Sequence, residues 1–159
     1  ITKSTLEYFE GILDQVKFAE QEAILGASIA DQTQILITRR FFSKEEIFSF
    51  DAEQLYTTMI DKGFMGEDIK TLSIGLVAIK GDKGKAQMVL NGEKTAIFFD
   101  FAKENKQWKI DITTTLIMTT KFIEGQARKA NISTTQYLLD MLQLNEEEAE
   151  QIWKPLELR

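Results

Sequence analysis

The stretch "AIFFDFAKENKQWKIDI", from Ala96 to Ile112, decides the fold. On both sides of its charged centre, Lys103 to Lys106, apolar and polar residues alternate. A period of two is typical of a β-strand with one buried face, and a short polar segment between two such runs is typical of a hairpin. The sequence therefore predicts strands over residues 93–102 and 107–114, with a turn at Glu104-Asn105.

This hairpin sets the expected place of Trp108. Residues directly opposite each other in an antiparallel pair lie on the same side of the sheet. In the predicted register Trp108 faces Phe101, and Phe99 faces Ile110. We expect the aromatic pair to hold a curved sheet together, so that Trp108→Ala costs about 3–5 kcal/mol if the site is fully buried.

Two further turns extend the hairpin into a four-stranded antiparallel meander. Asn91-Gly92 is the strongest two-residue hairpin signal, and "GDKG" (Gly81 to Gly84) precedes it. They predict strands over residues 70–80 and 84–90. With an odd-length loop at Gly81–Lys83, one face collects the apolar residues Leu72, Ile74, Leu76, Ala78, Ala86, Met88, Leu90, Ile97, Phe99, Phe101, Trp108, Ile110 and Ile112.

The opposite face is mixed, with an apolar centre at Val77, Val89 and Phe98 and acidic residues at Asp100 and Asp111. A solvated face, a sheet-to-sheet homodimer contact and a cover made by C-terminal helices all fit this composition. A catalytic carboxylate is expected to point into a pocket on the aromatic side. Neither acid does so in this register, and we predict that neither is catalytic.

Helical patterns lie on both sides of the sheet. Apolar residues recur at helical spacing from Thr5 to about Leu25, and Gly26 is a plausible stop. A second helix is predicted over Asp31 to Arg40, and "SKEE" and "DAEQ" have capping-box spacing for two shorter ones. After the sheet we expect helices over 120–130, from "STTQ" and from "NEEE". The prediction is one α+β domain over 1–159, with 1–64 helical, 70–114 an antiparallel sheet and 120–155 a helical extension.

The composition excludes several kinds of protein. The chain has no Cys and no His, which excludes disulfides, thiolate nucleophiles, Cys/His zinc sites and His-based triads. A net charge of −6 argues against a nucleic-acid partner. No apolar run approaches the roughly 18 residues of a membrane span. We expect a soluble protein, either cytoplasmic or exported after removal of an N-terminal leader.

No motif predicts a metal or a cofactor. "GDKGK" fails the phosphate-loop pattern, because Ile79 stands where the first Gly is needed and Ala86 where Ser or Thr is needed. The acidic segments "NEEEAE" (145–150) and "GED" (66–68) lack EF-hand spacing. Arg39-Arg40 is the only paired Arg. We interpret it as a surface pair anchored by the neighbouring Phe residues in preference to an anion site.

The helix-first order, the hairpin from Gly75 to Gly92 and the "F-x-F-x-K-E-x-x-x-W-K-I-D" pattern from Phe99 to Asp111 together resemble the nuclear transport factor 2-like (cystatin-like, SnoaL-like) superfamily. The resemblance implies an α+β cone in which a curved sheet wraps helices around an apolar pocket. Phe99, Phe101, Trp108, Ile110 and Tyr56 would line that pocket. Many members dimerise through the outer sheet face, which here would use Val77, Val89 and Phe98.

Three functions are compatible with these residues. The favoured one is a non-catalytic binding or interaction domain with an apolar pocket, which takes a small apolar ligand and forms a homodimer. The catalytic residues of enzymatic family members have no match in this chain, which supports this function. The alternative is a small-molecule isomerase or hydrolase that uses a helix-borne Glu or Tyr with Arg39 or Arg40. The third is an accessory domain that acts through its C-terminal helices.

Overall fold

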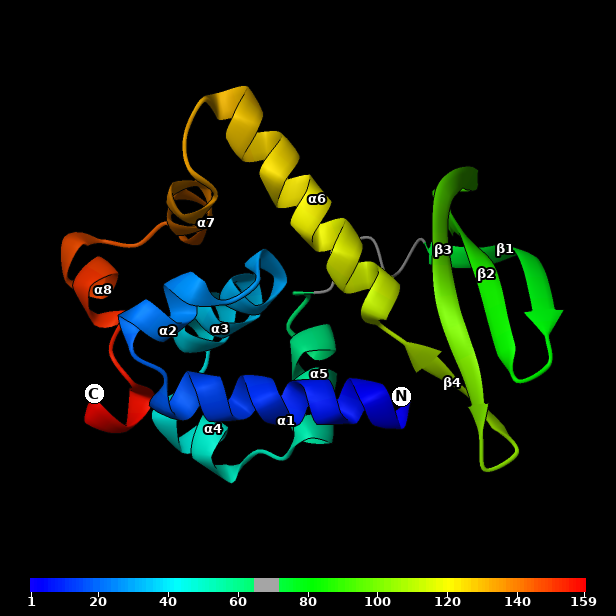
Figure 1. The fold of residues 1–159 in the computed structure, drawn as a ribbon, viewed down its shortest axis with the longest axis horizontal. Helices are drawn as coiled ribbons and strands as arrows, with labels where there is room; N and C mark the ends of the chain where they lie inside the picture. The colour runs from blue at the N-terminus through cyan, green and yellow to red at the C-terminus, as the bar shows by residue number, and fades with distance from the viewer. Residues whose placement is uncertain (65–71) are drawn as a thin grey trace.

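The computed structural model describes residues 1–64 and 72–159. Residues 70 and 71 of the first predicted strand, and the "GED" segment, lie outside the described residues. The chain is α+β, with a helical body and a four-stranded antiparallel sheet beside it (Figure 1). The elements are α1 (Lys3–Phe18), α2 (Gln21–Gly26), α3 (Ile29–Phe41), α4 (Lys44–Ser49), α5 (Ala52–Asp61), β1 (Leu72–Lys80), β2 (Lys83–Leu90), β3 (Glu93–Glu104), β4 (Gln107–Asp111), α6 (Thr113–Ala130), α7 (Thr134–Leu142), α8 (Glu146–Gln151) and a 3₁₀ turn (Leu156–Leu158).

The first helix is shorter than predicted. The expected helix from Thr5 to Leu25 is two helices, because Ala19 and Glu20 have extended backbone between α1 and α2. The break leaves carbonyls at the end of α1 without a helical partner. The guanidinium of Arg39 on α3 donates to the carbonyls of Val16 and Ala19, and also to that of Gln15, which already accepts from the Ala19 N–H.

The predicted caps of the next helices are confirmed. Ser43 and Glu46 form a capping box at the start of α4, and Asp51 and Gln54 form one at the start of α5. Each box satisfies two backbone N–H groups that would otherwise lack a partner. Helix α3 covers the predicted range of 31–40 and begins two residues earlier, at Ile29.

The hydrophobic core lies in the helical body. Its main cluster joins α1, α3, α4 and α5, with the buried residues Phe9, Ile12, Leu13, Val16, Ile24, Ile35, Phe42, Ile47, Ala52, Leu55, Tyr56, Met59, Ile112 and Leu156. A second cluster packs α6, α7 and the residue after α8 against α3, through Leu36, Ile123, Leu138, Leu142 and Ile152. Helix α7 and Ile152, which follows α8, therefore bury apolar side chains against the helical body.

The sheet has the predicted meander order, β1-β2-β3-β4. The Asn91-Gly92 turn is confirmed: both residues have positive φ, and Leu90 pairs with Glu93. Each of the other two turns closes one position away from its predicted place. Lys80 pairs with Lys83 around a two-residue turn, and Glu104 pairs with Gln107 around Asn105-Lys106, which both have positive φ.

The shift in the last hairpin changes which residues are opposed, and the shift at 81–82 also changes which residues share a face. Trp108 lies opposite Lys103, and Phe101 lies opposite Ile110. The even turn at 81–82 places Val77 opposite Ala86, so Val77 is on the aromatic face and Ala78 is on the other. The predicted faces of Val77 and Ala78 were both wrong, because the prediction assumed a three-residue loop at Gly81–Lys83. A register shift between Ile74 and Val77 places Ile74 opposite Met88.

Helix α6 begins earlier than predicted. The last strand was predicted to reach residue 114 and the next helix to begin at residue 120, whereas α6 begins at Thr113. The pairing of β4 with β3 ends at Asp111, and Ile112 is buried in the helical core with its N–H donated to the Thr5 hydroxyl. Tertiary anchoring at Ile112 therefore overrides the strand propensity of the β-branched residues.

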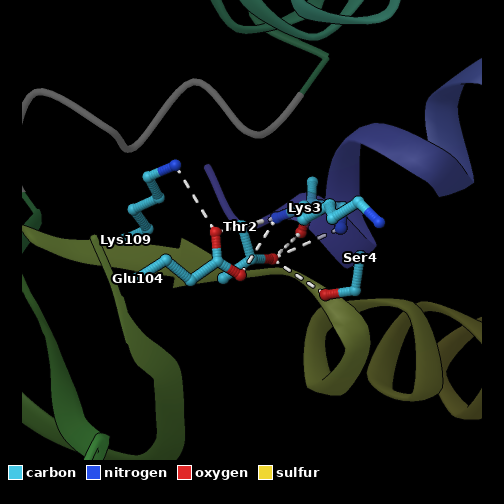
Figure 2. A network of polar contacts seen from close by, with 6 residues as sticks. Thr2, Lys3, Ser4, Glu104 and Lys109 are labelled. Atoms are coloured by element: carbon cyan, nitrogen blue, oxygen red, sulfur yellow. Dashed lines mark hydrogen bonds and ion pairs between the residues drawn. The ribbon is translucent and has the colours of Figure 1, made fainter.

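The start of α1 clamps the last hairpin (Figure 2). The Thr2 N–H donates to the Ile110 carbonyl at 3.0 Å, which continues the hydrogen bonding at the β4 edge. The Lys3 N–H donates to both carboxylate oxygens of Glu104, at 3.1 Å each, and Lys109 Nζ lies 3.4 Å from the same carboxylate. Glu104 also places a negative charge at the positive end of the α1 dipole.

Replacement of Glu104 by alanine is expected to loosen this junction. The loss of charge-assisted hydrogen bonds to the Lys3 amide should lower the free energy of unfolding by about 1–2 kcal/mol. Urea denaturation measures the loss, and amide hydrogen exchange at Lys3 should accelerate. Glu93→Ala, at the end of the neighbouring hairpin, is the matched control. An equal effect of both substitutions would show that the clamp adds nothing.

Candidate functional site

A cleft of about 530 Å³ lies at the sheet and the first turn of α6. A row of directly opposed residues crosses its floor: Ala78, Lys85, Asp100 and Asp111. Lys85 Nζ lies 3.1 Å from Asp100, and the Thr114 hydroxyl donates to the same carboxylate. Two opposed acids repel each other, and these contacts offset that repulsion. Lys80 and Lys83 add positive charge at the end of the cleft.

Asp100 and Asp111 share the face opposite the aromatic one, as predicted. The cleft nevertheless lies on their face, whereas the sequence placed the pocket on the aromatic side. The carboxylate of Asp100 is held by a cation and a hydroxyl. Within the described residues, no group of three or more acidic side chains is arranged to hold a metal ion.

The aromatic face carries a second, shallow cavity of about 190 Å³, lined by Ile74, Val77, Ile79, Gly84, Lys85, Ala86, Phe101 and Trp108. Trp108 lies close over Gly84: a Cβ added to Gly84 would be 3.5 Å from its ring and 3.8 Å from Ile79 Cγ1. The absence of a side chain at Gly84 lets the indole lie against the sheet. Four large side chains remain open to solvent, with exposed fractions of 55% at Ile74, 58% at Val77, 62% at Ile79 and 42% at Trp108. We call these four residues the apolar patch.

The structure brings only some of the expected pocket residues together. Phe101 and Trp108 line the shallow cavity, and Phe99 and Ile110 belong to the same face of the sheet. Tyr56 lies in the helical core, where its ring centroid is 5.4 Å from that of Phe9.

The expected interface residues are divided between two faces. Val77 is on the aromatic face, whereas Phe98 lies opposite Gln87 on the cleft side. Val89 is buried, and a Cβ on Gly75 would meet its Cγ2 atom at 3.0 Å. The prediction that all three share one outer face was wrong, because the turn at 81–82 has an even length.

Arg39 was expected on the surface, and the structure buries it. Its guanidinium donates to four carbonyls, those of Gln15, Val16, Ala19 and Ile152, at 2.6–3.1 Å. Burial lowers the pKa of Arg39 to about 10, which leaves it charged at neutral pH. Arg40 forms an ion pair of 2.7 Å with Glu148. Arg39 therefore links helices and has little donor capacity left for a substrate.

None of the three tyrosines lines the cleft or the shallow cavity. Burial raises the pKa of Tyr8 and of Tyr56, and the nearby Asp31 charge raises that of Tyr8 further. Tyr137 packs against the second core cluster. A desolvated tyrosine with a raised pKa keeps its proton at neutral pH, which makes it a poor general base.

None of the helices in residues 1–64 and 72–159 has the length and apolar character needed to cross a bilayer. Comparison of the chain with protein-family models, with curated proteins and with solved structures found no match.

Proposed function

We propose that the protein is a non-catalytic interaction domain that binds its partner through the apolar patch of the sheet. The observation that carries the proposal is the exposure of Ile74, Val77, Ile79 and Trp108 on one face. Monomeric proteins rarely expose contiguous apolar surface of this kind without a binding role. Trp is also the residue most enriched among those that dominate binding energy.

The nuclear transport factor 2-like assignment and the closed cone with an apolar pocket form the finer part of this proposal. Their support is the helix-first order, the meander and the pattern from Phe99 to Asp111. A small apolar ligand would then occupy the aromatic side of the sheet. Ile79 alternates with Val77 along the strand, so the register predicted from the sequence places Ile79 with Val77 on the outer face, away from that ligand.

A titration with the neutral apolar dye Nile red tests the proposal. The wild type should bind the dye with enhanced fluorescence, and Ile79→Lys should weaken binding by about tenfold, since a buried charge is costly. Phe122→Lys, at an exposed Phe on α6, is the matched control. Dye binding that Ile79→Lys leaves unchanged would contradict binding at the apolar patch and would favour the closed cone.

The second candidate function is a small-molecule isomerase or hydrolase. The cleft favours it, because its volume of about 530 Å³ is in the usual range for ligand sites and it contains Asp100 and Asp111. Arg39, Arg40 and the tyrosines, which this hypothesis first invoked, do not line the cleft. Turnover of a small substrate that Asp111→Asn abolishes would establish this function and overturn the non-catalytic one.

A further inference from the structure

The two edges of the sheet differ in how they are covered. At the β4 edge, the Thr2 N–H donates to the Ile110 carbonyl, and the start of α1 lies against the hairpin (Figure 2). At the other edge, β1 pairs with β2 on one side, and no described strand pairs with it on the other. Figure 1 places β1 on the side of the sheet away from α6 and the helical body. Within residues 1–64 and 72–159, one edge is therefore closed by the chain itself and the other is open.

The open edge lacks the features that usually protect one. Natural edge strands are short, or carry Lys or Pro within the strand. Strand β1 has nine residues, "LSIGLVAIK", and its single charged residue, Lys80, is the last. Leu76 is also exposed, at 66%, beside the exposed Ile74, Val77 and Ile79 of the apolar patch. The irregular pairing between Ile74 and Val77 is the only protective feature in the strand.

We propose that a second copy of the chain occupies this edge, with β1 paired antiparallel to its two-fold related β1 at an axis near Val77. The proposal rests on the proposed function, because it names the partner of the apolar patch. A two-fold axis makes the contact self-complementary. In this register Leu76 of one copy lies opposite Ala78 of the other, and Lys80 lies opposite Ile74.

The charges of the chain favour a second copy at this place. Each chain carries a net charge of −6, so two copies repel each other over most of their surface. Strand β1 has no acidic residue, and its one charge is positive. The two copies of Lys80 would lie about 20 Å apart along the paired strands. That distance exceeds the screening length of about 8 Å at physiological salt, so these lysines would not oppose pairing.

Pairing would also extend the apolar patch. Strand pairing forms an eight-stranded sheet from two four-stranded ones, in which backbone hydrogen bonds supply affinity. Ile74, Val77 and Ile79 of both copies would then lie side by side on one face. The aliphatic side chains of the two copies would contact one another across the new strand pair.

Sedimentation velocity of the full chain at roughly 200 µM tests the pairing. The wild type should be a dimer, and Val77→Lys should weaken dimerisation by at least about tenfold, since two like charges would meet at the axis. Phe122→Lys, which adds the same charge on α6, should remain dimeric. Circular dichroism shows whether each variant retains its fold. A monomeric wild type, or a Val77→Lys variant that dimerises as well as the wild type, would overturn the proposal.

Cysteine cross-linking tests the position of the axis, and the chain has no native Cys to interfere. Under mild oxidation Val77→Cys should give a disulfide-linked dimer, because opposed Cβ atoms at the axis lie close to disulfide distance. Lys80→Cys should not cross-link. Equal cross-linking at both positions would overturn the register. If the wild type is monomeric yet binds Nile red, the proposed dimer is wrong, whereas the proposed interaction function is retained.

Discussion

Replacement of Arg39 by methionine is expected to lower the free energy of unfolding by about 4 kcal/mol. The guanidinium is only 4% exposed in a chain where most charged side chains face water. It donates to the carbonyls of Gln15, Val16 and Ala19 at the end of α1 and to that of Ile152 after α8. Methionine fills a similar volume and donates nothing, so the carbonyls of Val16, Ala19 and Ile152 would lose this donor, at a cost of about 1–3 kcal/mol each before relaxation, while that of Gln15 keeps the Ala19 N–H.

The effect is large because domains of this size have a stability of only about 5–15 kcal/mol. Arg39 also joins segments that are far apart in the sequence, since α1, α3 and the end of α8 all meet at its guanidinium. Loss of the side chain should therefore loosen the break between α1 and α2 and the attachment of the C-terminal segment together. Lysine at this position keeps the charge but lacks the planar arrangement of five donors, so we expect a partial loss.

Urea denaturation of Arg39→Met, Arg39→Lys and Arg40→Met measures these effects. Arg40→Met is the matched control, because its ion pair with Glu148 is partly exposed and such pairs contribute about 0–1 kcal/mol. A loss at Arg39 no larger than that at Arg40 would show that water or rearranged backbone replaces the guanidinium contacts.

The role of Arg39 has a weak signal in the sequence. Ile35, Leu36 and Arg39 lie on one side of α3 at helical spacing, and the first two are fully buried. An arginine on an apolar stripe can lie at its rim or within the core, and the sequence pattern does not distinguish the two. Arg39 is buried because the chain breaks at Ala19 and Glu20 and offers it carbonyls at the end of α1. No Gly or Pro at this position predicts the break.

Turn chemistry explains which parts of the sheet could be predicted. Asn91-Gly92 has one favourable position for a two-residue turn, and the pairing of Leu90 with Glu93 followed from it. "GDKG" and "KENK" each allow several turns, and a shift of one residue moves a whole strand to the other face. The element order and the class were therefore predictable, whereas the face of Val77 and the partner of Trp108 were not.

The same uncertainty affected the candidate site. Phe99, Phe101, Trp108 and Ile110 share a face in the structure, as a period of two requires. Whether that face is covered depends on where the helices pack. Helix α1 does not cover it, because its apolar residues Phe9 and Ile12 pack against α3 and α5. Period alone cannot tell a face that is buried within the chain from one that is covered by a partner.

Phe9→Ala is expected to lower the free energy of unfolding by about 3–5 kcal/mol, the usual range for removing a fully buried aromatic side chain. Phe9 is 1% exposed, and its ring centroid lies 5.4 Å from that of Tyr8 and 5.4 Å from that of Tyr56. The cavity would open where α1 and α5 meet, between helices that the rest of the core holds in place. Little collapse is possible there, which favours the upper part of the range.

Trp108→Ala supplies the comparison. It removes a larger aromatic side chain, but one that is 42% exposed. The lost burial against Gly84 and Ile79 should cost about 1 kcal/mol, well below the value expected for a fully buried site. Urea denaturation of both variants at low protein concentration keeps self-association out of the measurement. If Trp108→Ala costs as much as Phe9→Ala, the indole is covered within one chain, and the closed cone replaces the open apolar patch. If its cost rises with protein concentration, a partner copy supplies the cover.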